Sequence, residues 1–343
     1  MAIHERKGLD MGKLDKNDLD TLLKCVKKYP EVVVPPMAGF DSGVHSIDDK
    51  YLVVSTDPCI GVPEEWFGWL LIHYAASDVA LFGAKPQYCA INLLGSSLTK
   101  PQTFHRIMQQ TCKAADELQM SIVTGHTGTY DGLATLVGTC TAYGIIDKHK
   151  LITPACAKPG DIIFCIKPLG LETAVNFALT HRTLADKLLG VNQTDELRRQ
   201  IQMQSCVKEA LLLSDANAVH AMHDTTEGGL TAALNEMADA SKLGFRIDFN
   251  KIPIHGAVRL LQNCFQLSDN QILSISSTGT IIASAKPEAQ NIIQNIMSSA
   301  GAAAKSIGIF TKNKTRILVK DEKETIFPEA AEDPYQMILS GKV

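Results

Sequence analysis

The sequence lacks a long hydrophobic run, an excess of basic residues and an apolar leader. Its longest apolar-looking stretch, residues 66–76, is interrupted by Gly68 and His73 and is too short to span a bilayer. The first thirteen residues contain no apolar signal core, so we expect a cytoplasmic protein with no membrane contact. Lys+Arg number 33 and Asp+Glu 37, and the net charge of -4 offers no general binding surface for nucleic acid.

The sequence also lacks closely spaced cysteines. Nine are present, the closest two are nine residues apart, and no C-x-x-C pair occurs, which excludes a zinc knuckle and a thioredoxin-type motif. The count is odd, and cysteines such as Cys89 and Cys165 lie in apolar stretches. We therefore expect reduced thiols that serve as small, buried core residues.

The common short signatures of nucleotide, metalloprotease and hydrolase sites are missing too. There is no G-x-x-x-x-G-K-[ST], G-x-G-x-x-G, H-E-x-x-H or G-x-S-x-G. What is present is a chain of 343 residues, 45% hydrophobic and 20% charged, which is long and apolar enough for a substantial core and for two domains.

Strand and helix patterns alternate in both halves of the chain, which predicts two α/β or α+β domains. An irregular segment at residues 154–160 separates them, so we place the domains at 1–155 and 156–343. The local patterns predict a strand at 51–56, a helix at 63–83, a strand at 121–124 followed by a loop at 125–129, a helix at 195–214, and a loop at 223–229 before a helix at 230–240.

Acidic residues stand where several of these elements end. Asp41 lies in a glycine-rich loop, Asp57 closes a buried strand, Asp78 interrupts an apolar helix and Asp224 precedes a helix. Carboxylates at element ends can hold Mg²⁺ together with phosphate oxygens. Each acid alone is more often a turn residue or a helix cap, and Asp78 can equally lie on a solvated helix face.

Two histidines are open to two interpretations. His126 lies between Gly125 and Thr127 at the end of a predicted strand, where it can contact phosphate, transfer a proton or simply form a turn. His223, directly before Asp224, carries the same alternatives.

Five blocks occur in an order that resembles one protein family. They are Gly39-Phe40-Asp41-Ser42-Gly43-Val44, Ser55-Thr56-Asp57-Pro58, residues 76–86 (ASDVALFGAKP), Thr124-Gly125-His126-Thr127, and residues 224–230 (DTTEGGL). Together they resemble the PurM-like, aminoimidazole-ribonucleotide (AIR) synthetase-related superfamily over about residues 30–310. Its members include HypE-type hydrogenase-maturation proteins, thiamine-monophosphate kinase and selenophosphate synthetase.

The resemblance implies an N-terminal α/β domain that forms a β-barrel across a homodimer, and a C-terminal α+β domain. It implies ATP and Mg²⁺ as cofactors, bound between acidic loops. By the same resemblance the metal ligands are Asp41, Asp57, Asp78 and Asp224; Thr56, Gly125 and Thr127 join these acids in cofactor binding; and Asp57, His126 and Asp224 are the catalytic residues. His126 stands where HypE and thiamine-monophosphate kinase have Asp, which puts one metal ligand in doubt.

The choice within the superfamily favours a HypE-like enzyme. The Asp224–Leu230 loop resembles HypE, but no cysteine follows Cys264, whereas HypE-type proteins carry their substrate on a C-terminal cysteine. We therefore expect an ATP-dependent phosphoryl-transfer enzyme that activates an amide-like or other small-molecule oxygen, with a maturation protein as a further partner. The alternatives are an enzyme like thiamine-monophosphate kinase or selenophosphate synthetase, and a non-catalytic nucleotide-binding scaffold.

Overall fold

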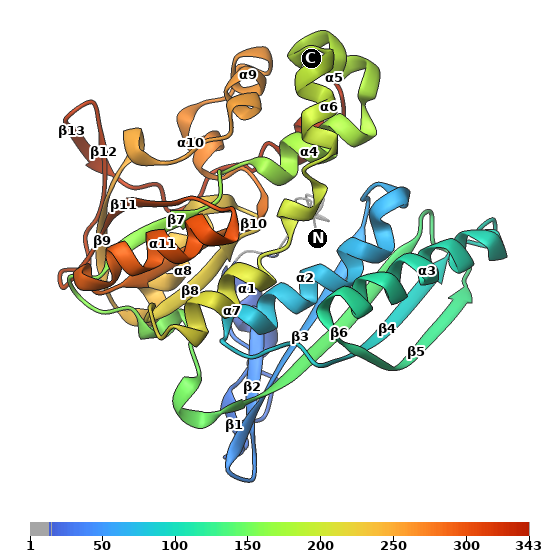
Figure 1. Ribbon diagram of the computed structural model, residues 1–343, viewed down its shortest axis with the longest axis horizontal. Coiled ribbons are helices and arrows are strands. Elements are labelled where there is room, and N and C mark those ends of the chain that lie inside the picture. The colour runs from blue at the N-terminus through green and yellow to red at the C-terminus, as the bar shows by residue number, and fades with distance from the viewer. Residues whose placement is uncertain (1–13, 15, 343) are drawn as a thin grey trace, which may run out of the picture.

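The computed structural model describes Leu14 and residues 16–342, which form two β-sheets, one in each half of the chain (Figure 1). The expectation about a leader concerns the first thirteen residues and lies outside the described part. Among the described helices, none combines the length and the apolar character that crossing a membrane requires.

The N-terminal sheet has six strands in the order β1-β2-β3-β6-β4-β5. Neighbouring strands are antiparallel except β4 and β5, which run parallel and are therefore joined by a helical crossover, α3. The elements of this half are α1 (Lys16–Leu23), β1 (Val32–Val34), β2 (Ser42–Ile47), β3 (Lys50–Ile60), η1 (Glu64–Trp66), α2 (Phe67–Leu81), β4 (Tyr88–Gly95), α3 (Pro101–Leu118), β5 (Ser121–Thr129), β6 (Val137–Asp147) and η2 (Lys148–Lys150).

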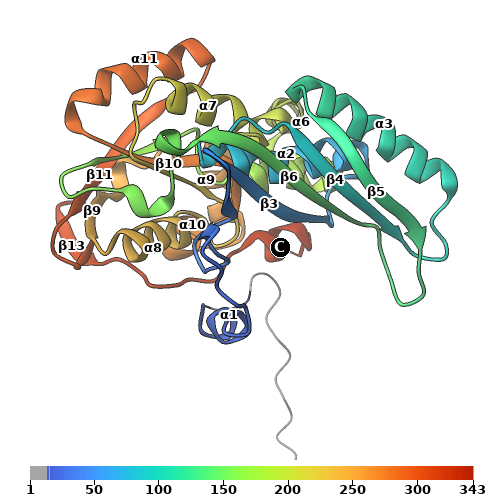
Figure 2. The same cartoon turned by 90° about the horizontal axis from the view of Figure 1, so that it is seen from below.

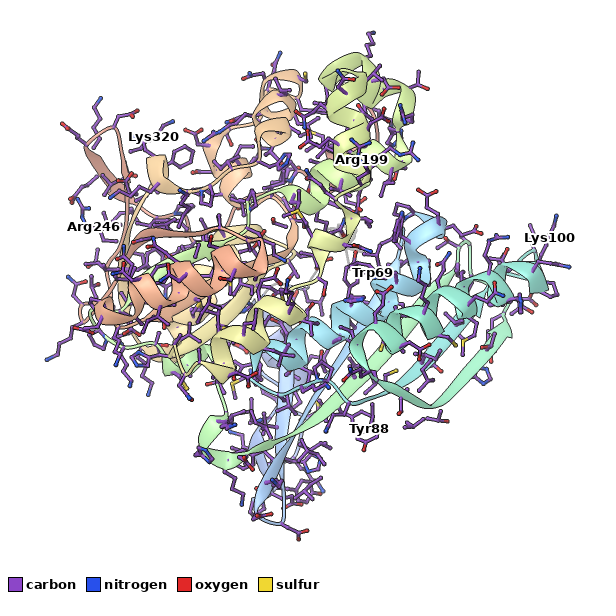
Figure 3. The ribbon with its side chains drawn as sticks, viewed as in Figure 1. Trp69, Tyr88, Lys100, Arg199, Arg246 and Lys320 are labelled. Carbon is purple, nitrogen blue, oxygen red and sulfur yellow. The ribbon has the colours of Figure 1, made fainter. Side chains whose placement is uncertain are left out.

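Helices α2 and α3 cover one face of this sheet, and the two lie on the same side of it in Figure 2. Trp69 of α2 reaches across to α3, where its Nε1 donates to Glu117 at 3.0 Å (Figure 3). The opposite face presents Tyr88, stacked on Tyr143, and the exposed side chains of Ile60 and Ile145. A half-apolar sheet face of this kind is suited to contact with another surface.

The C-terminal sheet has seven strands in the order β13-β12-β9-β11-β7-β10-β8, antiparallel except for the β12–β9 pair. Its strands are β7 (Ile162–Ile166), β8 (Ala221–Thr225), β9 (Gly244–Asp248), β10 (Ser277–Ala285), β11 (Ala304–Thr311), β12 (Arg316–Lys320) and β13 (Lys323–Ile326). Its helices are η3 (Pro154–Cys156), α4 (Leu171–Thr180), α5 (Arg182–Leu189), α6 (Val191–Arg198), η4 (Ile201–Gln204), α7 (Val207–Asp215), α8 (Gly229–Ser241), η5 (Phe249–Lys251), α9 (Gly256–Cys264), α10 (Asp269–Leu273), η6 (Pro287–Ala289), α11 (Gln290–Ala300) and α12 (Tyr335–Leu339).

Helix α2 joins the two halves, because it packs on its own sheet and also on the C-terminal half. His73 Nδ1 lies 2.7 Å from Ser205 Oγ, and the Cys206 amide donates to Ser77 Oγ at 3.2 Å. Fourteen of the fifteen residues of α2 are consequently buried. A helix that is buried on all sides has little use for a polar stripe, which explains its nearly continuous apolar sequence.

Several expectations about local structure are wrong at element boundaries. Strand β3 continues through Asp57 and Pro58 to Ile60, because β6 pairs with it over that whole length while β2 stops pairing at Ser55. A proline is tolerated on a strand whose one edge has no partner. Residues 125–129 belong to β5 and are not a loop, and residues 223–225 belong to β8. The helix predicted at 195–214 is three shorter elements, α6, η4 and α7.

The cysteines form no disulfide among the described residues, in agreement with the reduced thiols expected. Five are buried as predicted, namely Cys59, Cys89, Cys140, Cys165 and Cys206. For three others, Cys25, Cys112 and Cys156, the expected burial is wrong because they lie on exposed parts of the surface, Cys112 for example on the outer side of α3.

Candidate active site

Two segments far apart in the sequence meet at Asp41, directly before strand β2. Gly39 has φ of +79°, and a Cβ at this position would come within 2.9 Å of Glu236 Cβ on α8. Glycine is therefore required both by the backbone conformation and by the close approach to α8. This contact brings the Asp41 carboxylate against the end of β8, where His223 and Asp224 lie.

Asp41, His223 and Asp224 form a group whose nitrogen and oxygen ligand atoms all lie within 4.8 Å of one another. His223 Nδ1 is 3.7 Å from Asp41 Oδ2 and 3.6 Å from Asp224 Oδ1. On the other side of the ring, Nε2 is 3.0 Å from Glu236 Oε2. The cluster thus joins the residue before β2, the end of β8 and the middle of α8.

Asp78 enters the same region from α2. It is only 3% exposed, and its Oδ2 accepts a hydrogen bond from Ser55 Oγ at 2.7 Å. Burial raises the pKa of Asp78 well above its ordinary value, and the charges of Asp57, Asp41 and Asp224 raise it further. The alternative of a solvated helix face is therefore wrong, and the four predicted acids lie close enough to repel one another.

Residues 55–57 of β3 divide between the two faces of the sheet. Ser55 and Asp57 share the face covered by α2, since side chains alternate along a strand. Thr56 points to the opposite face, where its Oγ1 lies 3.0 Å from Thr141 Oγ1. The structure brings Asp57 to the acidic cluster but not the neighbouring threonine, whose contact with phosphate remains a prediction.

The predicted residues of β5 lie further away. Strands β6 and β4 separate β3 from β5, so Gly125, His126 and Thr127 stand three strands from Asp57 in the same sheet. His126 is exposed, and its Nε2 lies 2.6 Å from the Tyr130 hydroxyl. Within one chain these three residues do not join the carboxylates, and their roles in catalysis and cofactor binding remain predictions.

Two further residues of the site, and two carboxyl groups outside it, were not predicted. Ser42 follows Asp41 directly, and Glu236 completes the contact with His223. Asp333, near the C-terminus, accepts from the amide of Gly228 at 3.3 Å. Ser42 could have been found from the sequence because it is the neighbour of the predicted ligand Asp41. No local pattern marks Glu236, Asp333 or Glu172, which is described next.

Glu172 is a buried carboxyl in the first turn of α4, 8% exposed. Its Oε2 accepts two hydrogen bonds from Thr278, from the amide at 2.8 Å and from the hydroxyl at 2.7 Å. Burial raises the pKa of Glu172 to about 7, against the opposing effect of the Thr278 hydrogen bonds and with the support of Asp333 and Glu227. Glu172 therefore changes its charge near neutral pH.

This shift predicts a stability change with a definite sign. The folded state binds the Glu172 proton more tightly than the unfolded state between pH 4.5 and about 7, so the free energy of unfolding falls as pH rises through that window. The total effect is about 3 kcal/mol. Glu172→Gln retains an oxygen for Thr278 and removes the titration, so we expect the variant to exceed wild type in stability at pH 8 but not at pH 4, as measured by denaturant unfolding.

The exposed Glu288 supplies the matched control, because it lies in η6 with its side chain in solvent. Glu288→Gln should follow wild type at both pH values. If the free energy of unfolding of Glu172→Gln still changed between pH 4 and pH 8 as much as that of wild type, the pH dependence could not be assigned to Glu172.

The donor set of the cluster fits a divalent cation with phosphate. Ser42 Oγ is buried, with the residue only 2% exposed, and no described group hydrogen-bonds to it. Ser42 pairs directly with Ser55, so both side chains lie on the face where Ser55 contacts Asp78. A buried hydroxyl of this kind calls for a polar ligand, and hard carboxylate oxygens are suited to Mg²⁺.

Comparison with known proteins places this geometry in a family. The family model for the N-terminal domain of AIR synthase related proteins matches residues 39–146, and that for the C-terminal domain matches residues 158–320. A selenide, water dikinase of Myxococcus xanthus is 30% identical over 264 residues, covering 73% of this chain and 70% of that protein. A carbamoyl dehydratase HypE of Rhizobium leguminosarum bv. viciae is 25% identical over 262 residues, covering 75% and 72%.

A solved structure shares the arrangement of both sheets. The hydrogenase maturation protein HypE in complex with ATP superposes with a TM-score of 0.67 at 19% identity, covering 92% of this chain and 91% of that one. The two-domain PurM-like fold predicted from the five sequence blocks is therefore confirmed. The chain belongs to the AIR synthase related family.

Proposed function

We propose that the chain is an ATP- and Mg²⁺-dependent phosphoryl-transfer enzyme that activates an amide-type or other oxygen of a small molecule. The observation that carries this proposal is the convergence of Asp41, Asp57, Asp78 and Asp224 from four separate elements beside the buried Ser42 hydroxyl. A cluster of acids that raises the pKa of one of its own members is costly for folding unless a cation compensates it.

The residues of the site have separable tasks in this proposal. Asp41, Asp57 and Asp224 would hold Mg²⁺, which when bound neutralises charge on the phosphate oxygens and orients them. Ser42 would donate its hydroxyl proton to a bound oxygen, while Ser55 fixes the Asp78 carboxyl. Catalysis would rest on positioning and charge neutralisation, and no covalent protein intermediate is required.

The similar proteins support an ATP-dependent reaction of this class. One is a dikinase, one a carbamoyl dehydratase, and the superposed HypE structure holds ATP. The dikinase name and the ATP complex of HypE both support an ATP-dependent reaction, although the named reactions differ. A maturation protein as partner remains a prediction by analogy with HypE.

A cavity of about 590 Å³ offers room for a small acceptor. It lies beyond the end of β3, at Gly61 and Pro63, between α3 and the C-terminal half. Arg106 and Arg198 line it, each beside a glutamate, with Arg106 bonded to Glu64.

The uncovered face of the N-terminal sheet supports a homodimer. This face carries Ile60, Ile145 and the stacked Tyr88–Tyr143 pair, and no helix of the described chain packs on it. Two such faces placed together would close the barrel that the family resemblance implies. His126, which lies opposite Asn92 in β4, would then face the partner subunit.

The proposal predicts that the protein binds ATP only with a divalent cation and releases ADP when a suitable acceptor is present. Isothermal calorimetry with ATP, in the presence of Mg²⁺ and in its absence, measures the first. ADP release in the presence of carboxamides or phosphorylated vitamins measures the second. Absence of ATP and ADP binding with Mg²⁺ would reject the enzyme, whereas ATP binding without turnover would favour the non-catalytic nucleotide-binding scaffold.

A further inference from the structure

The acidic cluster contains a nitrogen atom in a position suited to a metal ligand. His223 Nδ1 lies 3.7 Å from Asp41 Oδ2 and 3.6 Å from Asp224 Oδ1, with the His223 side chain 2% exposed. These separations are too long for hydrogen bonds. Two ligand atoms that each lie ~2.1 Å from one ion are separated by roughly 3 to 4 Å, so the three atoms can share an ion.

The other ring nitrogen of His223, Nε2, lies close to a carboxylate. Nε2 of His223 is 3.0 Å from Glu236 Oε2, and Glu236 is itself packed against Gly39. A metal-binding histidine characteristically donates its second N–H to a carboxylate, which orients the ring and raises its basicity. Glu236 Oε2 lies at ion-pair distance on that side of His223, where Nε2 makes no hydrogen bond to a described residue. The contact of Glu236 with Gly39 ties it to the loop that carries Asp41.

Without a metal, Nδ1 of the His223 ring carries a proton. Nδ1 also lies 2.9 Å from the backbone oxygen of Asp224, to which it donates its proton. A metal ion would replace the Nδ1 proton, which leaves to solvent, and would meet the same carboxylates.

A second observation points independently to a bound ligand. The hydroxyl of Ser42, beside Asp41, is buried and has no hydrogen-bond partner among the described residues. Ser42 shares the sheet face of Ser55, whose hydroxyl contacts Asp78. The buried Ser42 hydroxyl needs a hydrogen-bond partner, and a metal-bound water or a phosphate oxygen can supply it.

We propose that His223 Nδ1 is a metal ligand together with Asp41 and Asp224, oriented by Glu236, and that this site binds Mn²⁺ more tightly than Mg²⁺. The reason is that a first-row transition ion accepts an imidazole nitrogen beside carboxylate oxygens, whereas Mg²⁺ prefers oxygen ligands throughout. The inference deepens the proposed function, since it concerns the same site, but its test requires no nucleotide.

The test uses Mn²⁺ alone with the full chain. Titration followed by the solution EPR signal of free Mn²⁺ measures the affinity, and competition with Mg²⁺ measures the preference, expected to be at least about tenfold. Pulsed EPR of the bound ion should show coupling to a ¹⁴N nucleus. In protein labelled with ¹⁵N-histidine this coupling should change to the ¹⁵N pattern, which identifies a histidine ligand without any mutation.

Variants then assign the nitrogen to one residue. His223→Gln should lose the nitrogen coupling and bind Mn²⁺ at least about tenfold more weakly, with a much smaller change for Mg²⁺. Glu236→Gln should weaken Mn²⁺ binding by about 10- to 100-fold and keep the coupling. His220→Gln is the matched control, because His220 lies three residues earlier in the chain and pairs with Asp161 outside the cluster.

Mn²⁺ bound to the labelled wild-type protein without histidine coupling would overturn the proposal, as would failure to bind Mn²⁺. The labelled wild type decides the question even if His223→Gln does not fold. If Mn²⁺ shows the histidine coupling but the protein binds no ATP, His223 is supported as a metal ligand and the proposed enzyme is rejected. If the protein turns over ATP but bound Mn²⁺ shows no nitrogen coupling, the proposed enzyme is supported and the histidine ligand is rejected.

Discussion

Asp57→Asn is expected to lower divalent-cation-dependent ATP turnover by about 100- to 1000-fold, the range that loss of one preorganised electrostatic group costs. Asparagine has the same shape as aspartate but no charge, so it cannot compensate a cation beside phosphate oxygens. Asp57 also raises the pKa of Asp78, through its charge and through a shared hydrogen bond. The substitution should therefore bring the Asp78 pKa down towards its ordinary value while it weakens nucleotide binding.

Calorimetry with Mg²⁺ and ATP, together with ADP release, measures both effects of Asp57→Asn. The matched control is Asp147→Asn, since Asp147 belongs to β6, the neighbour of β3, and is an exposed carboxylate paired with Lys50 at 2.7 Å. That variant should bind nucleotide like wild type, because an exposed ion pair contributes little. Unchanged nucleotide affinity in Asp57→Asn would remove Asp57 from the site.

Gly229→Ala is expected to lower the free energy of unfolding by about 3 kcal/mol or more and to abolish nucleotide binding. Gly229 has φ of +56° at the start of α8, a conformation that costs an L-residue roughly 1–2 kcal/mol. A Cβ there would lie 2.6 Å from the backbone oxygen of Ile275 and 2.7 Å from the carbonyl carbon of Ser274. Backbone atoms cannot swing aside as a side chain can, so the 226–229 loop would have to move away from Asp224.

Denaturant unfolding measures the stability of Gly229→Ala, and calorimetry measures its ATP binding. Gly256→Ala is the control, because Gly256 begins α9, has ordinary φ and has open space where the Cβ would lie. That variant should be as stable as wild type or slightly more stable, since alanine loses less entropy on folding into a helix. A Gly229→Ala protein with wild-type stability would show that the loop tolerates a side chain.

The predicted acids illustrate how far local sequence reasoning reaches. Asp41 and Asp224 stand two and four residues from a glycine at the ends of elements, a placement that the sequence displays directly. Asp78 was undecided, because helical periodicity alone allowed a solvated face. Its burial follows from the position of α2, which is enclosed between its own sheet and the C-terminal half. That enclosure depends on residues more than a hundred positions away.

Strand β3 shows a different limit. The sequence pattern predicts that the strand ends before Asp57. Side chains alternate between the two faces of a sheet only within a strand, so the pattern could not say on which faces Thr56 and Asp57 lie. The pairing of β3 with β6 as far as Ile60 places the two side chains on opposite faces. Likewise, residues 125–129 form part of β5, three strands from β3, and this places His126 away from the acids of the other family blocks.

By itself the sequence determined the two-domain family fold and the set of acids, because hydrophobic periodicity, glycine positions and motif order are local properties of the chain. Only the tertiary structure decided which of those side chains converge. The isolation of the Ser42 hydroxyl and the burial of Glu172 depend on segments distant in sequence. His223 meets Glu236 because α8 packs back on β8. Charge and hydrogen-bonding state follow from such neighbours, since burial and nearby charges set how far the pKa of an ionisable group departs from the ordinary value of its residue type.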